Sequence, residues 1–507
     1  MLKSRKSKIL VLILLVLATS GYLFINLFII GNDKYQKFKI FDNTQKQIIK
    51  NYIFPYKVIS SNEKSISDFI SLANNLDLDY GNTEFEKLLT SEIKLKRSIK
   101  KYIFPYKYIS LQNEKIDKLN ELLYELETNY KDSGSDIKVT KSTIKLSNNN
   151  TLIKYKLNSG FYLGIQNKFP GSGYIDFYED NIFIISSRGI LAFRKNLNNN
   201  EENFKQIKTN IDDFIGLEQF KKSHKSSIKD LLISNGKIYI SFTEEIKNNC
   251  YNTSIVSGDI NYKYIKFNKL FSNECIDMPN NVSSQGGGRM VDFKDNHILF
   301  SVGDYRHRHF AQDKKSINGK ILKININNGE YEILSMGHRN PQGLYYDQEN
   351  DFILETEHGP LGGDEINLIE IENINKNDIQ NFGWAISSYG EHYGGKNSEQ
   401  NIKVYEKFPL YKSHNKHGFI EPLKYFVPSI AISEIVKIKK NTYALAAMGR
   451  EREGDKSIYF FELNKEKKII NIEQLKVYER VRDLRFKDNK LFLFMEDSPS
   501  IGVIELS

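Results

Sequence analysis

Two short runs of polar residues and glycines hold the side chains best suited to chemistry in this chain. The first, Gly337 to Gly343, reads Gly-His-Arg-Asn-Pro-Gln-Gly, and the second, Glu357 to Glu365, reads Glu-His-Gly-Pro-Leu-Gly-Gly-Asp-Glu. Arginine can bind a carboxylate through two parallel hydrogen bonds. The carbonyls of a glycine-rich turn beside an acidic residue suit a hard cation such as calcium. The two runs therefore predict a ligand site.

The segments between the two runs determine where the runs lie. Residues 344–347 and 352–357 alternate in polarity and are joined by a polar turn, a pattern typical of two paired strands. Asn340 precedes a proline and is biased to an extended backbone, while Gly359, Gly362 and Gly363 tolerate positive φ. Both runs should therefore lie at one end of a β-hairpin.

At these residues the chain resembles the glucose/sorbosone dehydrogenase family, the soluble aldose sugar dehydrogenases that use pyrroloquinoline quinone (PQQ). The sequence Asn-Phe-Gly-Trp, ending at Trp384, follows the two runs just as Asn-Tyr-Gly-Trp does in the family. Further matching segments are 288–290, 301–304, 319–325, 428–431 and 479–483. The resemblance is firm from about residue 285 to the C-terminus, extends less closely back to about residue 155, and is absent before that.

The resemblance implies oxidation of an aldose sugar or related alcohol with PQQ and calcium, and with an electron acceptor that these residues do not identify. The carbonyls of Gly359 and Pro360 would ligate calcium, and Asp364 and Glu365 would bind the ion or hold the loop in shape. The residues that would contact PQQ are Arg339, Asn340, Gln342, His358, Arg450, Arg480 and Arg482. Arg450 stands one position beyond the place where the family carries a cofactor-binding lysine, which is missing here.

Each of these roles has a plainer alternative. The Gly-Pro sequence can be a turn without a ligand, and Arg339 can pair with a carboxylate between blades. Strand alternation puts Arg480 and Arg482 on one face, which can equally be a solvated surface. Trp384 is the only tryptophan and is expected to pack in the core.

The chain departs from the family at the position of the catalytic base. In the family, a histidine four positions before the arginine of a Gly-Arg motif takes the proton of the sugar hydroxyl, and counting back from Arg289 gives Gln285. An amide nitrogen cannot accept a proton near neutral pH, so Gln285 can orient a hydroxyl but cannot be the base, while Arg339 would still lie near the substrate. His307 and His309 are alternative bases, although a basic surface turn is the plainer interpretation of their Arg-His-Arg-His run.

The region from about residue 155 to 507 has the pattern of an all-β domain. Short alternating runs of β-branched and aromatic residues each follow a turn pair. Four such pairs are Glu179-Asp180, Asn235-Gly236, Asp295-Asn296 and Asp488-Asn489. Pattern alone allows a sandwich or a propeller, and the resemblance implies a six-bladed β-propeller over 155–507.

The N-terminal residues 1–30 are predicted to be a membrane anchor. Four basic residues precede an uncharged run from Ile9 to Ile30, which as a helix would span roughly 33 Å, enough to cross a bilayer. A cleaved signal peptide is the competing interpretation, with Ala18 to Gly21 as its cleavage region. The anchor predicts a propeller on the outer side of the membrane, either periplasmic or extracellular.

Residues 31–150 are predicted to form a helical stalk with an internal duplication. The segment 49–60 recurs as 99–110, both with the core sequence Tyr-Ile-Phe-Pro-Tyr. Two copies are too few for a solenoid, so we expect two equivalent hairpin-like units that pack on each other or on a partner. A spacer between the membrane and the propeller is the plainer role for this segment.

Charge and cysteine content restrict the function further. The formal net charge is +9 in 507 residues, but basic and acidic residues are interleaved, which argues against nucleic-acid binding. Cys250 and Cys275 are the only cysteines, and their polar flanks in an exported region favour a disulfide over two buried thiols. A non-catalytic carbohydrate-binding or envelope scaffold propeller is the alternative to the enzyme, because fold alone does not establish function.

Overall fold

The computed structural model describes most of the chain after residue 54. The described residues are 55–75, 103–147, 150–157, 160–161, 171–195, 197, 203–223, 225–278, 284–373, 379–396, 399–449 and 456–506. The expected anchor at residues 1–30 and Arg450 lie outside this set. Among the described residues, no helix has both the length and the apolar character needed to cross a membrane.

The strands form six sheets, which confirms the six-bladed β-propeller. Blade one contains β3 (Gly173–Tyr178), β4 (Asn181–Ser186), β5 (Leu191–Lys195), β6 (Lys205–Thr209) and β10 (Tyr264–Ile265). Blade two contains β7 (Ile228–Ser234), β8 (Lys237–Lys247), β9 (Cys250–Asp259), β11 (Asn268–Phe271) and β12 (Ile276–Asp277). Blade three contains β13 (Gly287–Phe293), β14 (His297–Val302), β15 (Lys320–Asn325), β16 (Tyr331–Met336) and β20 (Gln380–Asn381).

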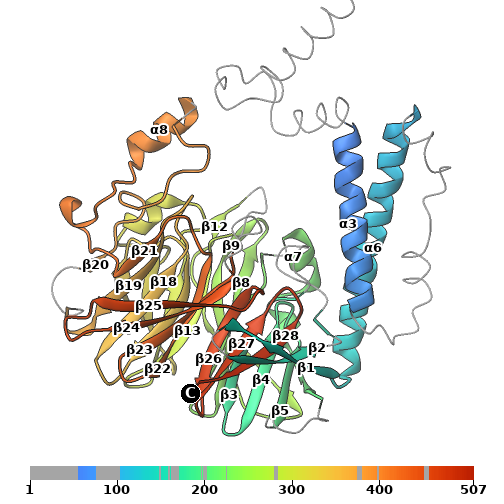
Figure 1. Ribbon diagram of the computed structural model, residues 1–507, viewed down its shortest axis with the longest axis horizontal. Coiled ribbons are helices and arrows are strands. Elements are labelled where there is room, and N and C mark those ends of the chain that lie inside the picture. Colours follow the sequence, from blue (N-terminus) through green and yellow to red (C-terminus); the bar gives the residue numbers. More distant parts are fainter. Residues whose placement is uncertain are drawn as a thin grey trace, which may run out of the picture. The chain divides into compact units, whose positions relative to one another are not determined.

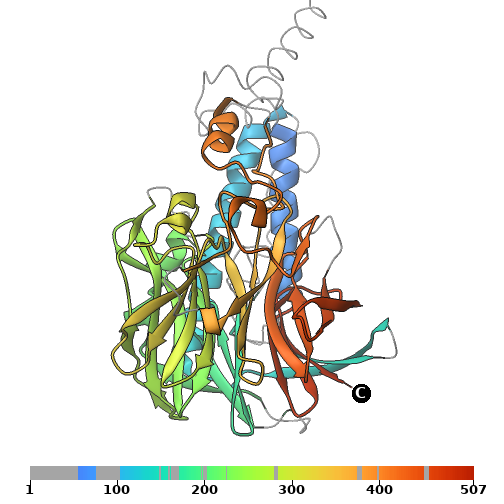
Figure 2. The ribbon, with the colours of Figure 1, turned by 90° about the vertical axis from the view of Figure 1, so that its left-hand side faces the viewer.

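Blade four contains β17 (Pro341–Asp347), β18 (Phe352–Glu357), β19 (Asp364–Glu370) and β21 (Lys424–Phe426). Blade five contains β22 (Ile432–Lys439), β23 (Thr442–Ala447), β24 (Ser457–Leu463) and β25 (Ile469–Lys476). Blade six contains β26 (Val481–Lys487), β27 (Lys490–Met495), β28 (Ser500–Glu505), β2 (Thr151–Leu157) and β1 (Val139–Lys145). Short helices in the connections are η4 (Ile211–Asp213), α7 (Leu217–Lys222), η5 (Arg308–Gln312), η6 (Ile371–Asn373), α8 (Glu399–Lys407) and η7 (Asn415–His417). The blades stand side by side in both views (Figure 1 and Figure 2).

Local turn chemistry explains the first hairpin of four blades. Asn235 and Gly236 join β7 to β8 with φ of 51° and 70°, and Asp488 and Asn489 join β26 to β27 with φ of 49° and 58°. Asparagine, aspartate and glycine tolerate this left-handed backbone, which matches the twist of two-residue hairpins. The predicted hairpins between β3 and β4, β7 and β8, β13 and β14, and β26 and β27 are all present.

The ring closes because strands from both ends of the propeller share one sheet. Leu152 of β2 pairs with Ile504 of β28, and β1 adds a fifth strand outside β2. The sheet therefore begins at Val139, earlier than the start at residue 155 that the sequence predicts and inside the expected stalk. The side chains of β1 are almost all exposed, so this strand lacks the apolar alternation by which a half-buried strand is identified.

The duplicated segment forms two helices, α3 (Pro55–Asn75) and α6 (Pro105–Ser133), which lie side by side in Figure 1. Each begins at the proline of its repeat, and proline is favoured in the first turn of a helix because its missing N–H needs no partner there. Gln112 donates a hydrogen bond of 3.3 Å to the carbonyl of Ile59, and Asn62 donates one of 2.7 Å to Asn113. The two copies thus pack on each other, as helices and not as hairpin-like units.

The predicted disulfide between Cys250 and Cys275 is present, with Cα atoms 5.2 Å apart. It links the first residue of β9 to the segment just before β12. Replacing both cysteines with serine should lower the free energy of unfolding by about 3–4 kcal/mol, because the bond closes a loop of 25 residues in the unfolded chain. Urea unfolding of the two proteins measures the difference. It should vanish when both are unfolded in reductant, and an unchanged midpoint without reductant would contradict the prediction.

Candidate functional site

The six innermost strands bring the candidate residues to one face of the propeller. Strands β3, β7, β13, β17, β22 and β26 each begin a blade, and each contacts the next around the ring. Because they all run in the same direction, their first residues meet at one end, while the tight turns lie at the other. The runs ending at Gly343 and starting at Glu357 flank β17 and β18, whose pairing forms the predicted hairpin.

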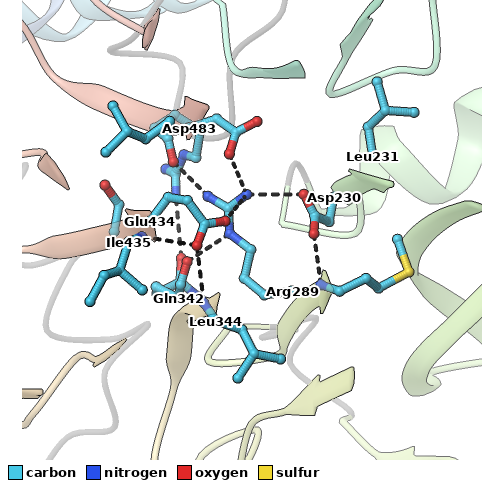
Figure 3. Close-up of polar contacts among 12 residues, drawn as sticks. Asp230, Leu231, Arg289, Gln342, Leu344, Glu434, Ile435 and Asp483 are labelled. Carbon is cyan, nitrogen blue, oxygen red and sulfur yellow. Dashed lines mark hydrogen bonds and ion pairs between the residues drawn. The ribbon is translucent and has the colours of Figure 1, made fainter. Parts of the chain in front are cut away.

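Arg289 of blade three binds carboxylates of three other blades beneath this face (Figure 3). Its Nη1 lies 3.0 Å from Asp230, 3.1 Å from Glu434 and 2.8 Å from Asp483, carboxylates of β7, β22 and β26. Its Nε and Nη2 donate to the carbonyls of Gln342 and Arg482, each at 2.6 Å. Three buried carboxylates that converge could hold a metal ion, but here the guanidinium of Arg289 occupies the space between them.

The charges of this network do not balance when every group is ionised. Arg485 is the second cation, 3.0 Å from Asp483 and 3.5 Å from Asp176. Two guanidiniums thus face four carboxylates, the three around Arg289 and that of Asp176. Burial, only partly offset by the arginines, raises the pKa of Asp230 to about 7 and that of Asp176 to about 6.

Arg480 and Arg482 lie on the same face at the start of β26, as strand alternation predicts. Both bind Glu496, from Nε of Arg480 at 3.0 Å and from Nε of Arg482 at 2.6 Å. The remaining nitrogens diverge, because Nη1 of Arg482 reaches the side chain of Gln342 at 3.2 Å while Nη1 of Arg480 donates to the carbonyls of Met448 and Gly449. Arg482 therefore faces the centre of the ring, and Arg480 is held at its rim.

Arg339 joins the two sequence runs. Its Nη1 donates to the carbonyls of His358 and Gly359 at 2.7 and 2.5 Å, and its backbone N–H donates to Glu357 at 2.6 Å. Its guanidinium carbon lies 5.4 Å from the ring centre of Trp384, within the range of a cation–π contact. The side chain is 6% exposed, so the guanidinium is preorganised at the Gly-Pro turn.

Gln285 lies between Asp304 and Arg339. With its amide oriented to suit both partners, its nitrogen donates to Oδ1 of Asp304 at 2.8 Å and its oxygen accepts from Nη2 of Arg339 at 2.7 Å. Asp304 also accepts from Nε1 of Trp384 at 2.8 Å, and burial raises the pKa of its carboxyl. Both polar atoms of the Gln285 amide thus form hydrogen bonds to protein groups, and neither can act as a general base near neutral pH.

The turn after β18 presents backbone oxygens but uses its acidic residue internally. Oδ1 of Asp364 accepts from the N–H of Gly359 at 3.1 Å, and Oδ2 accepts from the N–H of Ile432 at 3.2 Å. Of the two roles predicted for Asp364, the geometry therefore matches holding the loop in shape. His358 is fixed by a contact of 2.6 Å from Nε2 to the carbonyl of Ile432, and burial, reinforced by Arg339, lowers its pKa to about 4.

Glu365 belongs to a buried acidic group that adjoins the site through Glu357. It pairs across the sheet with Glu357, and its carboxylate lies 3.6 Å from Nε2 of His414. Glu355 and His338 lie in the same group, with 3.7 Å between their nearest oxygen and nitrogen. Burial raises the pKa of Glu357 to about 8 and that of Glu365 well above its usual range.

The two candidate histidines lie on the loop after Asp304. Nδ1 of His307 contacts the carbonyl of Tyr305 at 3.0 Å, and the ring of His309 packs on Phe310 with centroids 4.2 Å apart. His309 is exposed and His307 is partly buried. This placement is closer to the surface turn than to a base beside Gln285.

Two site residues were missed by the sequence argument. Trp384 is not simply a core residue, because it binds Asp304 through its indole N–H and stacks near Arg339. Asp304 holds Gln285. A signal existed for both, since Asp304 and Trp384 each end a segment that matches the family.

Comparison with known proteins identifies the family of this chain. The model of the family described as Glucose / Sorbosone dehydrogenase matches residues 228–504. The aldose sugar dehydrogenase YliI of Escherichia coli is 29% identical over 161 residues, 29% of this chain and 38% of that protein. The quinoprotein glucose dehydrogenase B of Acinetobacter calcoaceticus is 29% identical over 178 residues, 27% of this chain and 37% of that protein. The chain spans half or less of the length of the curated relatives it matches.

Solved structures share the fold. A crystal structure of a glucose dehydrogenase has a TM-score of 0.51 at 20% identity, over 66% of this chain and 96% of that one. The apo form of the soluble aldose sugar dehydrogenase of Escherichia coli has a TM-score of 0.50 at 19% identity, over 73% of this chain and 99% of that one. Because the family model covers more than half of the residues, the chain belongs to the glucose/sorbosone dehydrogenase family.

Proposed function

We propose that this protein is a PQQ- and calcium-dependent dehydrogenase of aldose sugars or related alcohols. The observation that carries the proposal is the position of Arg339. Its guanidinium donates to the carbonyls of His358 and Gly359 and to the amide oxygen of Gln285, which in turn binds Asp304, at the open ends of the innermost strands. The printed names of the relatives, an aldose sugar dehydrogenase and a quinoprotein glucose dehydrogenase, support the same activity.

The donors present fit both groups. PQQ carries three carboxylates, and arginine is the side chain best suited to such anions. Arg482 turns towards the ring centre, where the neutral side chain of Gln342 meets its Nη1. The carbonyls of Gly359 and Pro360 are hard oxygen ligands of the kind calcium prefers, on a turn that Asp364 holds in shape. When bound, PQQ supplies the acceptor for two electrons and calcium polarises it.

The residues of this chain then divide the remaining work. Arg482 binds the anionic cofactor, and Arg339 binds and orients oxygen atoms at the reacting centre, held in place by Trp384. Gln285 orients a substrate hydroxyl without taking its proton. Asn340 accepts from Gln342 at 3.2 Å and from the N–H of Gly287 at 3.4 Å, which keeps blades three and four in register beside the cofactor.

Titration of the full-length protein with PQQ tests this function. We expect binding that requires calcium and is lost on chelation, and we expect Arg482→Met to weaken it roughly 10- to 100-fold, because a hydrogen bond to a charged group contributes about 1.5–3 kcal/mol. Lys487→Met is the matched control, since it removes a positive charge from the far end of the same strand. Absence of PQQ binding with and without calcium would refute the proposal.

A non-catalytic sugar-binding propeller is the second candidate, and one observation favours it. Gln285 stands at the base position with both amide atoms bound by protein groups. A protein that binds PQQ and calcium but oxidises no aldose would fit this candidate. Activity with a dye as electron acceptor separates the two functions.

We also propose that residues 1–30 hold the protein in a membrane with the propeller on the outer side. The uncharged run behind four basic residues supports the anchor, and the disulfide supports an oxidising compartment. Fractionation of cells followed by N-terminal sequencing distinguishes this anchor from a cleaved signal peptide.

A further inference from the structure

Two lysines add positive charge to the face that carries the candidate site. Lys229 is the second residue of β7 and Lys225 lies in the loop that leads into that strand. Gly288 lies against Lys229, since a Cβ built on this glycine would stand 2.3 Å from that of Lys229, at a φ of 111°. The glycine thus lets the lysine lie against β13, next to Arg289.

Lys229 has no anionic partner among the residues that the structure describes. Its Nζ donates a hydrogen bond of 2.6 Å to the carbonyl of Lys225. Burial, followed by repulsion from Arg482 and Lys225, lowers the pKa of Lys229 to about 7. The neighbouring Asp230 does not offset this charge, because its carboxylate binds Arg289 and the N–H of Met290. Lys229 is partly buried, and even partial burial of a lysine without a counterion is costly.

The same excess of charge continues around the face. Arg306 lowers the pKa of Lys225, and Arg306 and Arg339 lower that of Arg308, after burial in each case. Asp304 opposes this repulsion at Arg308, but it is already bound by Gln285 and Trp384. Cations held together in this way create a positive potential that concentrates an anion.

We propose that Lys229, supported by Lys225, is a binding residue for a carboxylate of PQQ, near the carboxylate-binding position of Arg482. This inference rests on the proposed function and adds to it. Lys229 would supply an amine to the cofactor site from blade two, a part of the propeller to which the sequence assigns no cofactor contact.

The proposal predicts that PQQ binding takes up a proton. A carboxylate beside Lys229 favours the charged amine, so the pKa of this lysine rises in the complex. The gain in affinity is therefore fully present below pH 7 and is lost as the pH rises through the higher pKa of the bound state. From a free pKa of about 7, uptake at this lysine should be about half a proton per PQQ at pH 7 and close to one at pH 8.

Isothermal titration calorimetry of the full-length protein with PQQ and calcium measures the affinity for PQQ. Repeating it in buffers of different ionisation enthalpy measures the number of protons taken up on binding. We expect Lys229→Met to weaken PQQ affinity about 10- to 100-fold and to remove this share of the proton uptake. Lys229→Arg keeps the charge but does not titrate, so it should retain most of the affinity while losing the same share of the uptake. The difference in proton uptake between the wild type and these variants is the informative quantity, because Glu357, with a pKa of about 8, also titrates near the site and can contribute to the total uptake.

Lys237→Met is the matched control, because Lys237 lies in the same blade at the end where the tight turns are, beside Asp259. It should change neither the PQQ affinity nor the proton uptake. Thermal unfolding and near-ultraviolet circular dichroism establish that each variant is folded. Wild-type binding with unchanged affinity and proton uptake in Lys229→Met would overturn this inference and leave the proposed function intact. A wild-type protein that does not bind PQQ would overturn both.

Discussion

Replacing Gln285 with histidine should raise the rate of aldose oxidation by about 10²- to 10⁴-fold, the usual contribution of a general base. Gln285 already donates to Asp304 at 2.8 Å, so a histidine there can donate from one ring nitrogen to the carboxylate. The other nitrogen is then free to accept the proton of a sugar hydroxyl. Its pKa lies near the working pH, and Asp304 favours the imidazolium that forms. Initial rates of the PQQ- and calcium-loaded proteins with an artificial electron acceptor provide the measurement.

Gln285→Asn is the control for this experiment, because it retains an amide and should not gain activity. PQQ affinity should be similar in Gln285→His and the wild type, which separates proton transfer from cofactor binding. If the wild type oxidises aldoses rapidly and Gln285→His slows the reaction, Gln285 is not at the base position. In that case His307 is the first residue to replace, since it is less exposed than His309.

Replacing Arg289 with methionine should lower the free energy of unfolding by about 3–5 kcal/mol, the usual cost of removing one partner from a buried ion pair. Methionine fills much of the space of the arginine stem but leaves Asp230, Glu434 and Asp483 without the cation that lies 2.8–3.1 Å from each of them. The carbonyls of Gln342 and Arg482 also lose their donors. Urea unfolding measures the loss, and PQQ affinity should fall as well because Arg482 is no longer held.

The double variant Arg289→Met with Glu434→Gln provides the control. Removing one of the orphaned charges should recover part of the lost stability, so the two substitutions should not be additive. Arg289→Lys should fall between the wild type and Arg289→Met, because lysine retains the charge but not the planar set of donors. An unfolding midpoint for Arg289→Met equal to that of the wild type would show that Arg485 alone neutralises the network.

Much of the fold could be predicted because its signals are local. The turn pair at Asn235 and the hairpin between β17 and β18 depend on backbone preferences of adjacent residues and on alternation within single strands. The closing strands could not be predicted in the same way. β1 is almost fully exposed, and its place is determined by β2, which pairs with β28 from the other end of the chain.

The sequence by itself determined which residue types are available, from the arginines at 339 and 482 to the carbonyls of Gly359 and Pro360 and the glutamine at 285, because these stand in contiguous motifs with a family resemblance. Only the tertiary structure decided how they are used. Arg289 meets Asp230 and Asp483 from positions 59 and 194 residues away, and Gln285 meets Asp304 of its own blade and Arg339 at the start of the next blade. Burial on β7, followed by repulsion from Arg482 of β26, lowers the pKa of Lys229, and both depend on the folded ring. Charge neutralisation and burial depend on distances in space, which closure of the ring sets and no local pattern records.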